Sequence, residues 1–379
     1  MPSLSFYRVT LLAATLLVPG TLLAAMEQGR VSYGGLDDKG LSADTVLERS
    51  KPFEPLRPVP VVRFPVQGAA PERKGAVGRR AVEVTLLERA GETREGAEVA
   101  FGFPLAQGAL FDAEKLRVVD VASGEELPTQ VHLLAHWPDQ SLKSLLLQFR
   151  ADLAGRGSRK IAVEFGDAVS RKARAAGTLR VDQERGAIRV TTGPLEVVVD
   201  TERFVPFAKV DALEPERRRV AASSGIELED ENGVLHSSAF GAPESVRIER
   251  AGTHDAVIRI GGPFSTKGHG SLMRYVARLR FLAGSSRVDL SITLINSETD
   301  LEFTDIRRLG IDLVFPGADS WKATAGAGER VIESEGPLKL LQADERSLEE
   351  GATSAPGQMA GWLAIRSGAE RVQIAVRDF

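Results

Sequence analysis

Short stretches of alternating apolar and polar residues run through most of the chain. Val82, Val84 and Leu86 alternate with Glu83 and Thr85, which is the period of a half-buried β-strand. Similar short apolar runs continue from residue 99 to residue 165, and glycine, serine, proline and aspartate punctuate them as turns. Roughly six or seven short strands in about ninety residues predict a small closed barrel or sandwich over residues 81–168.

The second half of the chain, residues 177–379, repeats this pattern with longer strands. Leu195, Val197 and Val199 alternate with polar positions, and the dipeptide Asn232-Gly233 between apolar runs predicts a hairpin, because both residues tolerate positive φ. Two long strands are expected on either side of residues 283–286. We therefore expect a larger β-sandwich and an all-β fold overall, with the small barrel first.

The two long strands each have one apolar and one polar face. In the first strand one face carries Arg274, Arg278 and Arg280, and the opposite face carries Met273, Tyr275, Ala277, Leu279 and Phe281. In the second strand Val288, Leu290, Ile292 and Leu294 oppose Asp289, Ser291 and Thr293. The apolar faces are expected to pack on a second sheet, and the polar faces are expected to meet water.

Two stretches lack this alternation. Residues 26–80 contain scattered prolines among charged residues, which favours an extended linker and opposes helix formation. Residues 167–176, DAVSRKARAA, predict a charged, weakly helical link and the best domain boundary in the chain.

The N-terminus has the order of regions found in a secretory signal peptide. Arg8 precedes the apolar run 9–17, the helix breakers Pro19-Gly20 follow, and small residues stand at Ala24-Ala25. We expect residues 1–25 to be a signal peptide cleaved near Ala25, and the protein to be periplasmic or secreted with no stable membrane span. The alternative is an uncleaved membrane anchor.

Composition excludes several classes of function. The 379 residues carry 48 Lys and Arg against 52 Asp and Glu, for a net charge of −4 and with no concentrated basic face, so a nucleic-acid partner is not expected. Cysteine is absent, so disulfides and thiolate sites are excluded. The five histidines lie in separate elements, and no dinucleotide or phosphate-binding motif occurs. We therefore predict neither a metal nor a cofactor.

Two segments of the first domain contain the most specific sequence motifs in the chain. Residues 137–143, WPDQSLK, resemble the W-P-D-G-S-[IL]-[KR] turn of the YetA-like and exo-rhamnogalacturonan lyase family, and Gly102-Phe103-Pro104 with Gly108 and Leu110 resembles its G-F-P-x-x-x-G-x-L segment. The sequence departs from this pattern at Gln140, where the family has glycine, and at Ser144. Because a side chain disfavours positive φ, we expect the turn at Gln140 to differ locally.

The resemblance extends to the second half through residues 274–288 and 361–379. It implies a RIFT-type barrel, a central β-sandwich and β-elimination of uronic-acid polysaccharides. In the family a helical α/α toroid follows and contributes much of the substrate cleft. No long helical period occurs before Phe379, so we expect a protein truncated before that toroid and weakly active or inactive alone, or one whose helical domain is supplied by a separate chain.

The sequence offers few candidate site residues and no assignable catalytic one. His269, between two glycines, and Arg274, Arg278 and Arg280 are candidate contacts to a polysaccharide or oligosaccharide, although a solvated sheet face or a landing surface for the toroid is the better explanation of the arginines. A structural role in the barrel is predicted for the family-motif residues Gly102, Phe103, Pro104, Trp137, Pro138, Asp139, Ser141 and Lys143. The alternative function is a non-catalytic carbohydrate-binding or scaffold module.

Overall fold

The computed structural model describes residues 7–12, 78–173, 179–268, 270–297, 304–315, 322–327, 330–335, 340–342, 347–350, 353–356, 359–367 and 370–375. Apart from the short 3-10 helix η1 (Ala113–Lys115), the regular elements within these residues are all β-strands, which confirms the all-β fold class. Most of the predicted signal peptide and of the predicted linker 26–80 lie outside the described residues.

The chain divides into two compact units. One unit comprises residues 34–176 and is called the barrel unit below; the other comprises residues 1–33 and 177–379 and is called the sandwich unit.

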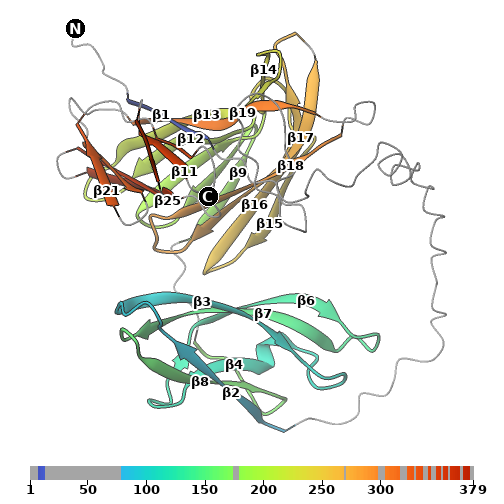
Figure 1. The fold of residues 1–379 in the computed structure, drawn as a ribbon. Helices are drawn as coiled ribbons and strands as arrows, with labels where there is room; N and C mark the ends of the chain where they lie inside the picture. The colour runs from blue at the N-terminus through green and yellow to red at the C-terminus, as the bar shows by residue number, and fades with distance from the viewer. Residues whose placement is uncertain are drawn as a thin grey trace, which may run out of the picture. The chain divides into compact units, whose positions relative to one another are not determined.

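The barrel unit contains two antiparallel sheets that face each other (Figure 1). The first has the strand order β2 (Arg80–Leu87), β8 (Ser158–Phe165), β4 (Leu116–Asp120) and β5 (Glu126–Leu127). The second has the order β3 (Arg94–Pro104), β7 (Leu142–Leu153) and β6 (Thr129–His136).

The core of the barrel unit forms where the alternating apolar side chains of both sheets meet. Its fully buried members include Leu116, Leu145, Leu147, Phe149, Ile161 and Val163. Phe149 meets Phe101 edge-on with ring centroids 6.1 Å apart, and Phe103 meets Phe165 in the same way at 5.8 Å. Such edge-to-face pairs suit the aromatic quadrupole, so they add to the burial energy of the rings.

The link after β8 differs from the prediction, because its described part, residues 167–173, contains a turn followed by irregular chain and no helix. Glu126 accepts hydrogen bonds from the backbone N–H groups of Lys172 at 2.7 Å and Ala173 at 2.8 Å. The Arg171 guanidinium donates to the Thr129 carbonyl at 3.2 Å. The backbone N–H groups of Lys172 and Ala173 therefore find their partner on the barrel instead of in a preceding helical turn.

The main sheet of the sandwich unit has twelve strands. Its continuous path runs β18 (Val288–Ile295), β17 (Ser271–Leu282), β16 (Asp255–Ser265), β14 (Leu235–Ser237), β13 (Arg218–Asp230), β12 (Val205–Ala212), β11 (Leu195–Asp200), β10 (Ala187–Thr191) and β9 (Arg180–Glu184). Beside this path β15 (Ser245–Ala251) pairs with β16, and β19 (Ile306–Phe315) pairs with β13 and with β1 (Tyr7–Leu12).

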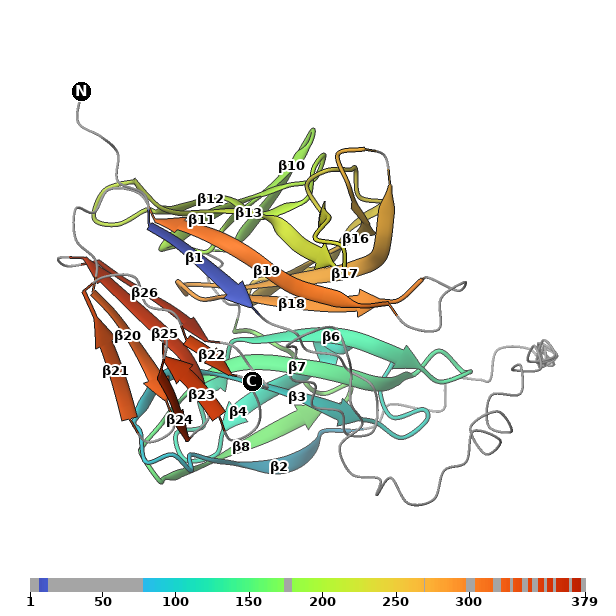
Figure 2. The ribbon, with the colours of Figure 1, turned by 45° about the horizontal axis from the view of Figure 1, so that its top comes forward.

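The long sheet folds over so that its two ends share one core (Figure 2). Ile188, Val197 and Phe204 from one end are buried against Ile258, Tyr275 and Leu279 from the other. The Tyr275 ring stacks on Phe204 at 5.4 Å and meets Phe264 edge-on at 5.2 Å. A β-sandwich therefore follows the barrel, as the alternation in the sequence predicted.

The long hairpin β17–β18 pairs in continuous register from Arg274 opposite Ile295 to Phe281 opposite Val288. Tyr275, Ala277, Leu279 and Phe281 are buried, whereas Arg274, Arg278 and Arg280 lie on the more exposed face. The prediction of one apolar and one polar face is thus confirmed.

The predicted hairpin at Asn232-Gly233 joins β13 to β14, but only Gly233 has a positive φ, of 78°. Asp230 holds the loop, because its carboxylate accepts hydrogen bonds from the backbone N–H groups of Asn232 at 2.9 Å and Val234 at 2.8 Å. Because the aspartate side chain bonds the backbone of its own turn, Asn232 does not have to adopt a positive φ for the hairpin to close.

Two smaller sheets complete the described part of the sandwich unit. One has the order β21 (Arg330–Ser334), β20 (Lys322–Ala327), β25 (Met359–Ser367) and β26 (Glu370–Ala375). The other has the order β22 (Leu340–Gln342), β23 (Ser347–Glu350) and β24 (Thr353–Pro356). A separate small core joins Phe315 of β19 to Ile365 of β25.

Candidate functional site

The two motif segments of the barrel unit lie against each other. The backbone N–H of Leu105 donates to the carbonyl of Lys143 at 2.9 Å, and that of Leu142 donates to the carbonyl of Leu110 at 2.8 Å. The Trp137 indole N–H also donates to the Leu105 carbonyl, at 3.0 Å. The segment after Gly102-Phe103-Pro104 is thereby joined to the Trp137 turn on both sides.

Ser141 connects the same two segments from a fully buried position. Its hydroxyl donates to Asp139 at 2.6 Å and accepts from the backbone N–H of Gly108 at 2.9 Å. The hydrogen bond from the Ser141 hydroxyl, helped by one from its backbone N–H, lowers the pKa of Asp139. Asp139 therefore stays ionised and serves as an acceptor inside the turn.

Gln140 adopts the left-handed backbone that its side chain was expected to resist, with φ 66°. The turn closes through hydrogen bonds from the Gln140 N–H to the Trp137 carbonyl at 2.9 Å and from the Trp137 N–H to the Ser141 carbonyl at 2.8 Å. These bonds and those of Asp139 hold the Gln140 backbone in the conformation that glycine prefers, so the side chain does not prevent the left-handed conformation.

Lys143 covers one face of Trp137, with its ammonium 4.6 Å from the ring centroid. This distance is within the range of a cation–π contact. The tryptophan is half-buried, and its N–H is used within the barrel. The motif residues therefore form a turn that joins two segments of the chain. Their contacts cover one face of the Trp137 indole.

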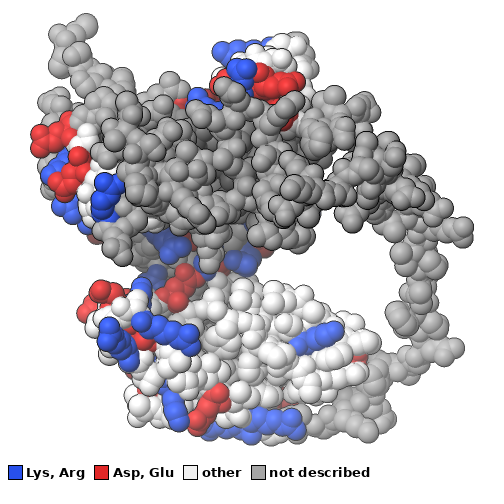
Figure 3. Space-filling model, viewed as in Figure 1, with Lys and Arg blue, Asp and Glu red and all other residues white. Residues whose placement is uncertain are grey.

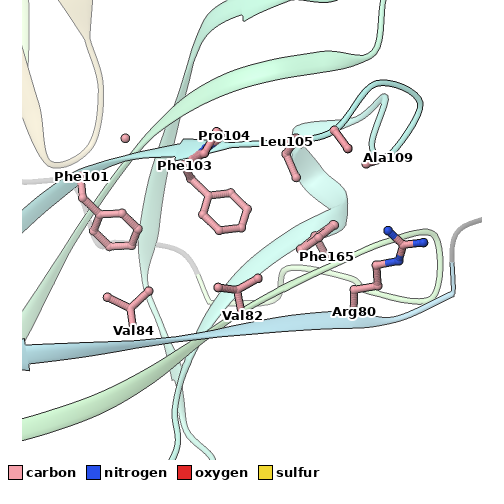
Figure 4. Close-up of a pocket in the computed structure, with 11 residues that line it drawn as sticks. Arg80, Val82, Val84, Phe101, Phe103, Pro104, Leu105, Ala109 and Phe165 are labelled. Carbon is pink, nitrogen blue, oxygen red and sulfur yellow. The ribbon is translucent and has the colours of Figure 1, made fainter.

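A pocket of about 310 Å³ lies between β2 and β3, each of which is an edge strand of its barrel sheet (Figure 4). Phe101 and Phe103 of β3 point toward Val82 and Val84 of β2, and Arg80 lies at one end. The lining is apolar apart from this arginine. Among the described residues no acid forms an ion pair with Arg80.

The three arginines predicted from β17 lie on one face of the sheet, and each of them meets an acid. Arg274 pairs with Glu244 and Arg278 pairs with Glu249, with a distance of 2.9 Å from the Arg278 Nε to the carboxylate. Arg280 reaches the buried Asp255 at 3.1 Å, and burial lowers the pKa of Arg280. Asp255 also pairs with Arg250 at 2.7 Å.

Two further arginines belong to this face and were not among the sequence candidates. Arg247 of β15 is in register with Arg259 of β16, and Arg259 is in register with Arg278 of β17. Residues directly opposite each other in an antiparallel sheet share a face, so the three side chains form a row across three strands. The polar positions of β15 and β16 were visible in the sequence, but their register was not.

The remaining candidates fall elsewhere. His269 lies outside the described residues. The buried His236 of β14 approaches Asp230, the last residue of β13, at 3.2 Å and has no contact to the arginine row among the described residues. Within the described residues no cluster of three or more acids and histidines has the arrangement of a metal site. The same part of the chain contains no helix with the length and apolarity of a membrane span.

Charged residues of both signs lie close together on the face shown in Figure 3, so the described surface there has no single large field of one charge. This agrees with the near balance of acidic and basic residues in the sequence. The arginine row, in which three basic side chains have one acid within reach, is a local excess of positive charge.

Comparison with known proteins finds a family similar to part of the barrel unit. Residues 80–145 match the family model described as the PcRGLX-like N-terminal RIFT barrel domain. A search of curated proteins finds no significant match. The matched range contains both motif segments, Gly102-Phe103-Pro104 and 137–143, which the structure brings together. Residues 80–145 of the barrel unit are thus similar to the N-terminal RIFT barrel domain of rhamnogalacturonan lyase-like proteins.

Proposed function

We propose that this chain is an exported, polysaccharide-lyase-like protein related to the exo-rhamnogalacturonan lyases. The observation that carries the proposal is the match of residues 80–145 to the N-terminal barrel domain of that family type. The order of units adds support, because a β-sandwich with an arginine-bearing face follows the barrel. The proposed substrate is a polysaccharide that contains uronic acid, and the proposed reaction is β-elimination.

The chemistry of the arginine face favours a second candidate, a carbohydrate-binding module without activity of its own. Guanidinium groups stay protonated at all working pH values and bind carboxylates through paired hydrogen bonds. Such groups can hold a uronate and neutralise its charge, but they are poor general bases for the proton on the neighbouring carbon. The face is therefore suited to binding, and turnover would need a base from elsewhere.

We further propose that the base comes from a helical domain supplied by a separate chain. The resemblance to the lyases motivates this proposal, since their cleft is completed by a helical toroid. Translating the DNA that flanks this reading frame tests it directly. A neighbouring frame that encodes long amphipathic helices supports a split lyase, and unrelated neighbours oppose it.

The full chain, incubated with uronic-acid polysaccharides, tests the enzyme proposal against the binding proposal. β-Elimination leaves an unsaturated uronate that absorbs ultraviolet light, so product formation can be followed continuously. We expect saturable binding by calorimetry with little or no product from the chain alone. Robust turnover would refute the proposed weak activity, and the absence of both binding and product would oppose both functions.

A further inference from the structure

The row formed by Arg247, Arg259 and Arg278 carries more positive charge than its surroundings neutralise. Glu249 is the acid within reach: its carboxylate lies 2.9 Å from the Nε of Arg278 and 3.7 Å from that of Arg259. Arg247 is exposed, and among the described residues it takes part in no ion pair or hydrogen bond. Three guanidinium groups thus face one carboxylate, and two positive charges remain for a ligand.

The row has a regular spacing and a direction. Neighbouring strands in a sheet lie about 4.8 Å apart, so the three arginines repeat at roughly that interval across β15, β16 and β17. The line of charge runs across the strands, and the side chains extend from one side of the sheet. A ligand that satisfies the row must therefore be extended and must present anionic groups at short, regular intervals.

The residues beside the row suit a sugar chain. The Ser245 hydroxyl lies 3.4 Å from Arg259, and Ser291 is directly opposite Arg278 on β18. Gly261 is in register with Ser245, and because it has no side chain, nothing projects from the sheet at that position beside the row. Hydroxyl groups next to guanidinium groups provide partners for both the hydroxyls and the carboxylates of a glycan.

We propose that the arginine row binds a linear polyuronate in which consecutive sugars carry a free carboxylate. One pyranose ring with its glycosidic bond is about as long as one strand spacing, so carboxylates on consecutive sugars match the repeat of the arginines. A polymer with a uronate at every second sugar would engage alternate arginines and leave the central one unmatched. This inference rests on the proposed function, because it takes the ligand to be a polysaccharide.

Titration calorimetry of the full chain with three polymers tests the spacing. The probes are de-esterified polygalacturonate, the same backbone as its methyl ester, and a rhamnogalacturonan backbone with alternating uronates. We expect polygalacturonate to bind at least about tenfold more tightly than either of the others, a free-energy difference of about 1.4 kcal/mol. The affinity should fall as salt is added, because exposed charges are screened. Equal binding of the ester or of the alternating polymer overturns the inference.

Substitutions assign the binding to the row. The double variant Arg247→Gln, Arg259→Gln should bind polygalacturonate at least about tenfold more weakly. Glu249→Gln should bind it more tightly, a change in a direction that misfolding cannot mimic. The matched control is Arg180→Gln on β9, an exposed arginine paired with Asp182 at 2.7 Å, which should leave the affinity unchanged. Unchanged binding by the double variant, or weaker binding by Glu249→Gln, contradicts the inference.

Product formation, measured separately in the same samples, distinguishes the binding role of the arginine row from the proposed lyase function. Selective binding without product supports the row and leaves the chain as a binding module. Product formation without the expected ranking of polymers supports a lyase and refutes the role of the row.

Discussion

Gln140 occupies a backbone position where a side chain is a disadvantage. Its φ of 66° lies in the left-handed region, which costs a non-glycine residue roughly 1–2 kcal/mol. We expect Gln140→Gly to raise the free energy of unfolding of the barrel unit by about 1 kcal/mol, as measured by calorimetric melting. Gln140→Ala retains the Cβ and should show no such gain, so equal stabilisation by both variants would locate the effect in the side chain instead of the backbone.

Glu88 is the acceptor that organises one end of the barrel unit. Its buried carboxylate accepts hydrogen bonds from the backbone N–H groups of Arg156 at 3.0 Å, Gly91 at 2.7 Å and Ala90 at 3.0 Å. These bonds, that from Arg156 above all, lower the pKa of Glu88 from 4.5 to about 2. Asp120, bonded to Arg159, has a pKa lowered in the same way to about 2.

A depressed carboxylate pKa stabilises the folded state above the unfolded pKa and loses this effect as the pH falls through the folded pKa. The contribution of Glu88 is thus complete at pH 7 and is lost between about pH 4.5 and pH 2. We expect Glu88→Gln to melt at a lower temperature than the natural protein at pH 7, and the difference between them to shrink as the pH approaches 2. A difference that does not change with pH would contradict the ionised role of Glu88.

At the scale of strands and turns, the sequence predicted the elements in which two faces differ in chemistry. The residues 273–281 could be assigned because apolar and arginine positions alternate without a break, and burial follows that alternation. The chain divides at the end of the predicted link 167–176, but the helical character predicted for this link is wrong over residues 167–173, because their partners Glu126 and Thr129 belong to other strands. The arginine row was likewise beyond the sequence, since it depends on the register between β15, β16 and β17.

The positions of β-bulges could not be predicted from the alternation of apolar and polar residues. The register of β13 against β19 shifts between Ser223 and Ile226, and Gly225 lies inside that shift. A Cβ at Gly225 would approach the Ala239 Cβ and the Ser237 Oγ to 2.7 Å each. The strand can therefore approach the segment after β14 closely only because the side chain is absent at this position.

We expect Gly225→Ala to destabilise the sandwich unit by about 1–3 kcal/mol, the usual cost of overpacking. Gly102→Ala is the matched control, because Gly102 also lies within a strand but a Cβ there meets nothing within 4 Å. The control should melt at an unchanged or slightly higher temperature. Calorimetric melting of both variants checks the prediction, and equal destabilisation would mean that strand glycines matter here for a reason other than space.

At the scale of the whole molecule, the proposed export can be read from the mature N-terminus. We expect expression in a bacterial host to yield a periplasmic or secreted protein whose first residue is Met26 or a close neighbour, as determined by N-terminal sequencing. Replacing Ala25 with a large charged residue should block processing. A mature protein that begins at residue 1 and stays with the membrane would favour the uncleaved anchor.

Strand β1 lies within that proposed leader, and all six of its residues pair with β19, from Tyr7 opposite Phe315 to Leu12 opposite Gly310. Residues 7–12 can therefore pair with β19 of the same chain instead of binding the secretion apparatus. This pairing becomes possible only after some three hundred further residues have been synthesised. If translocation is slow, the precursor can bury its signal sequence by pairing β1 with β19. Prompt engagement by the secretion apparatus would instead leave β19 with a free edge in the processed protein.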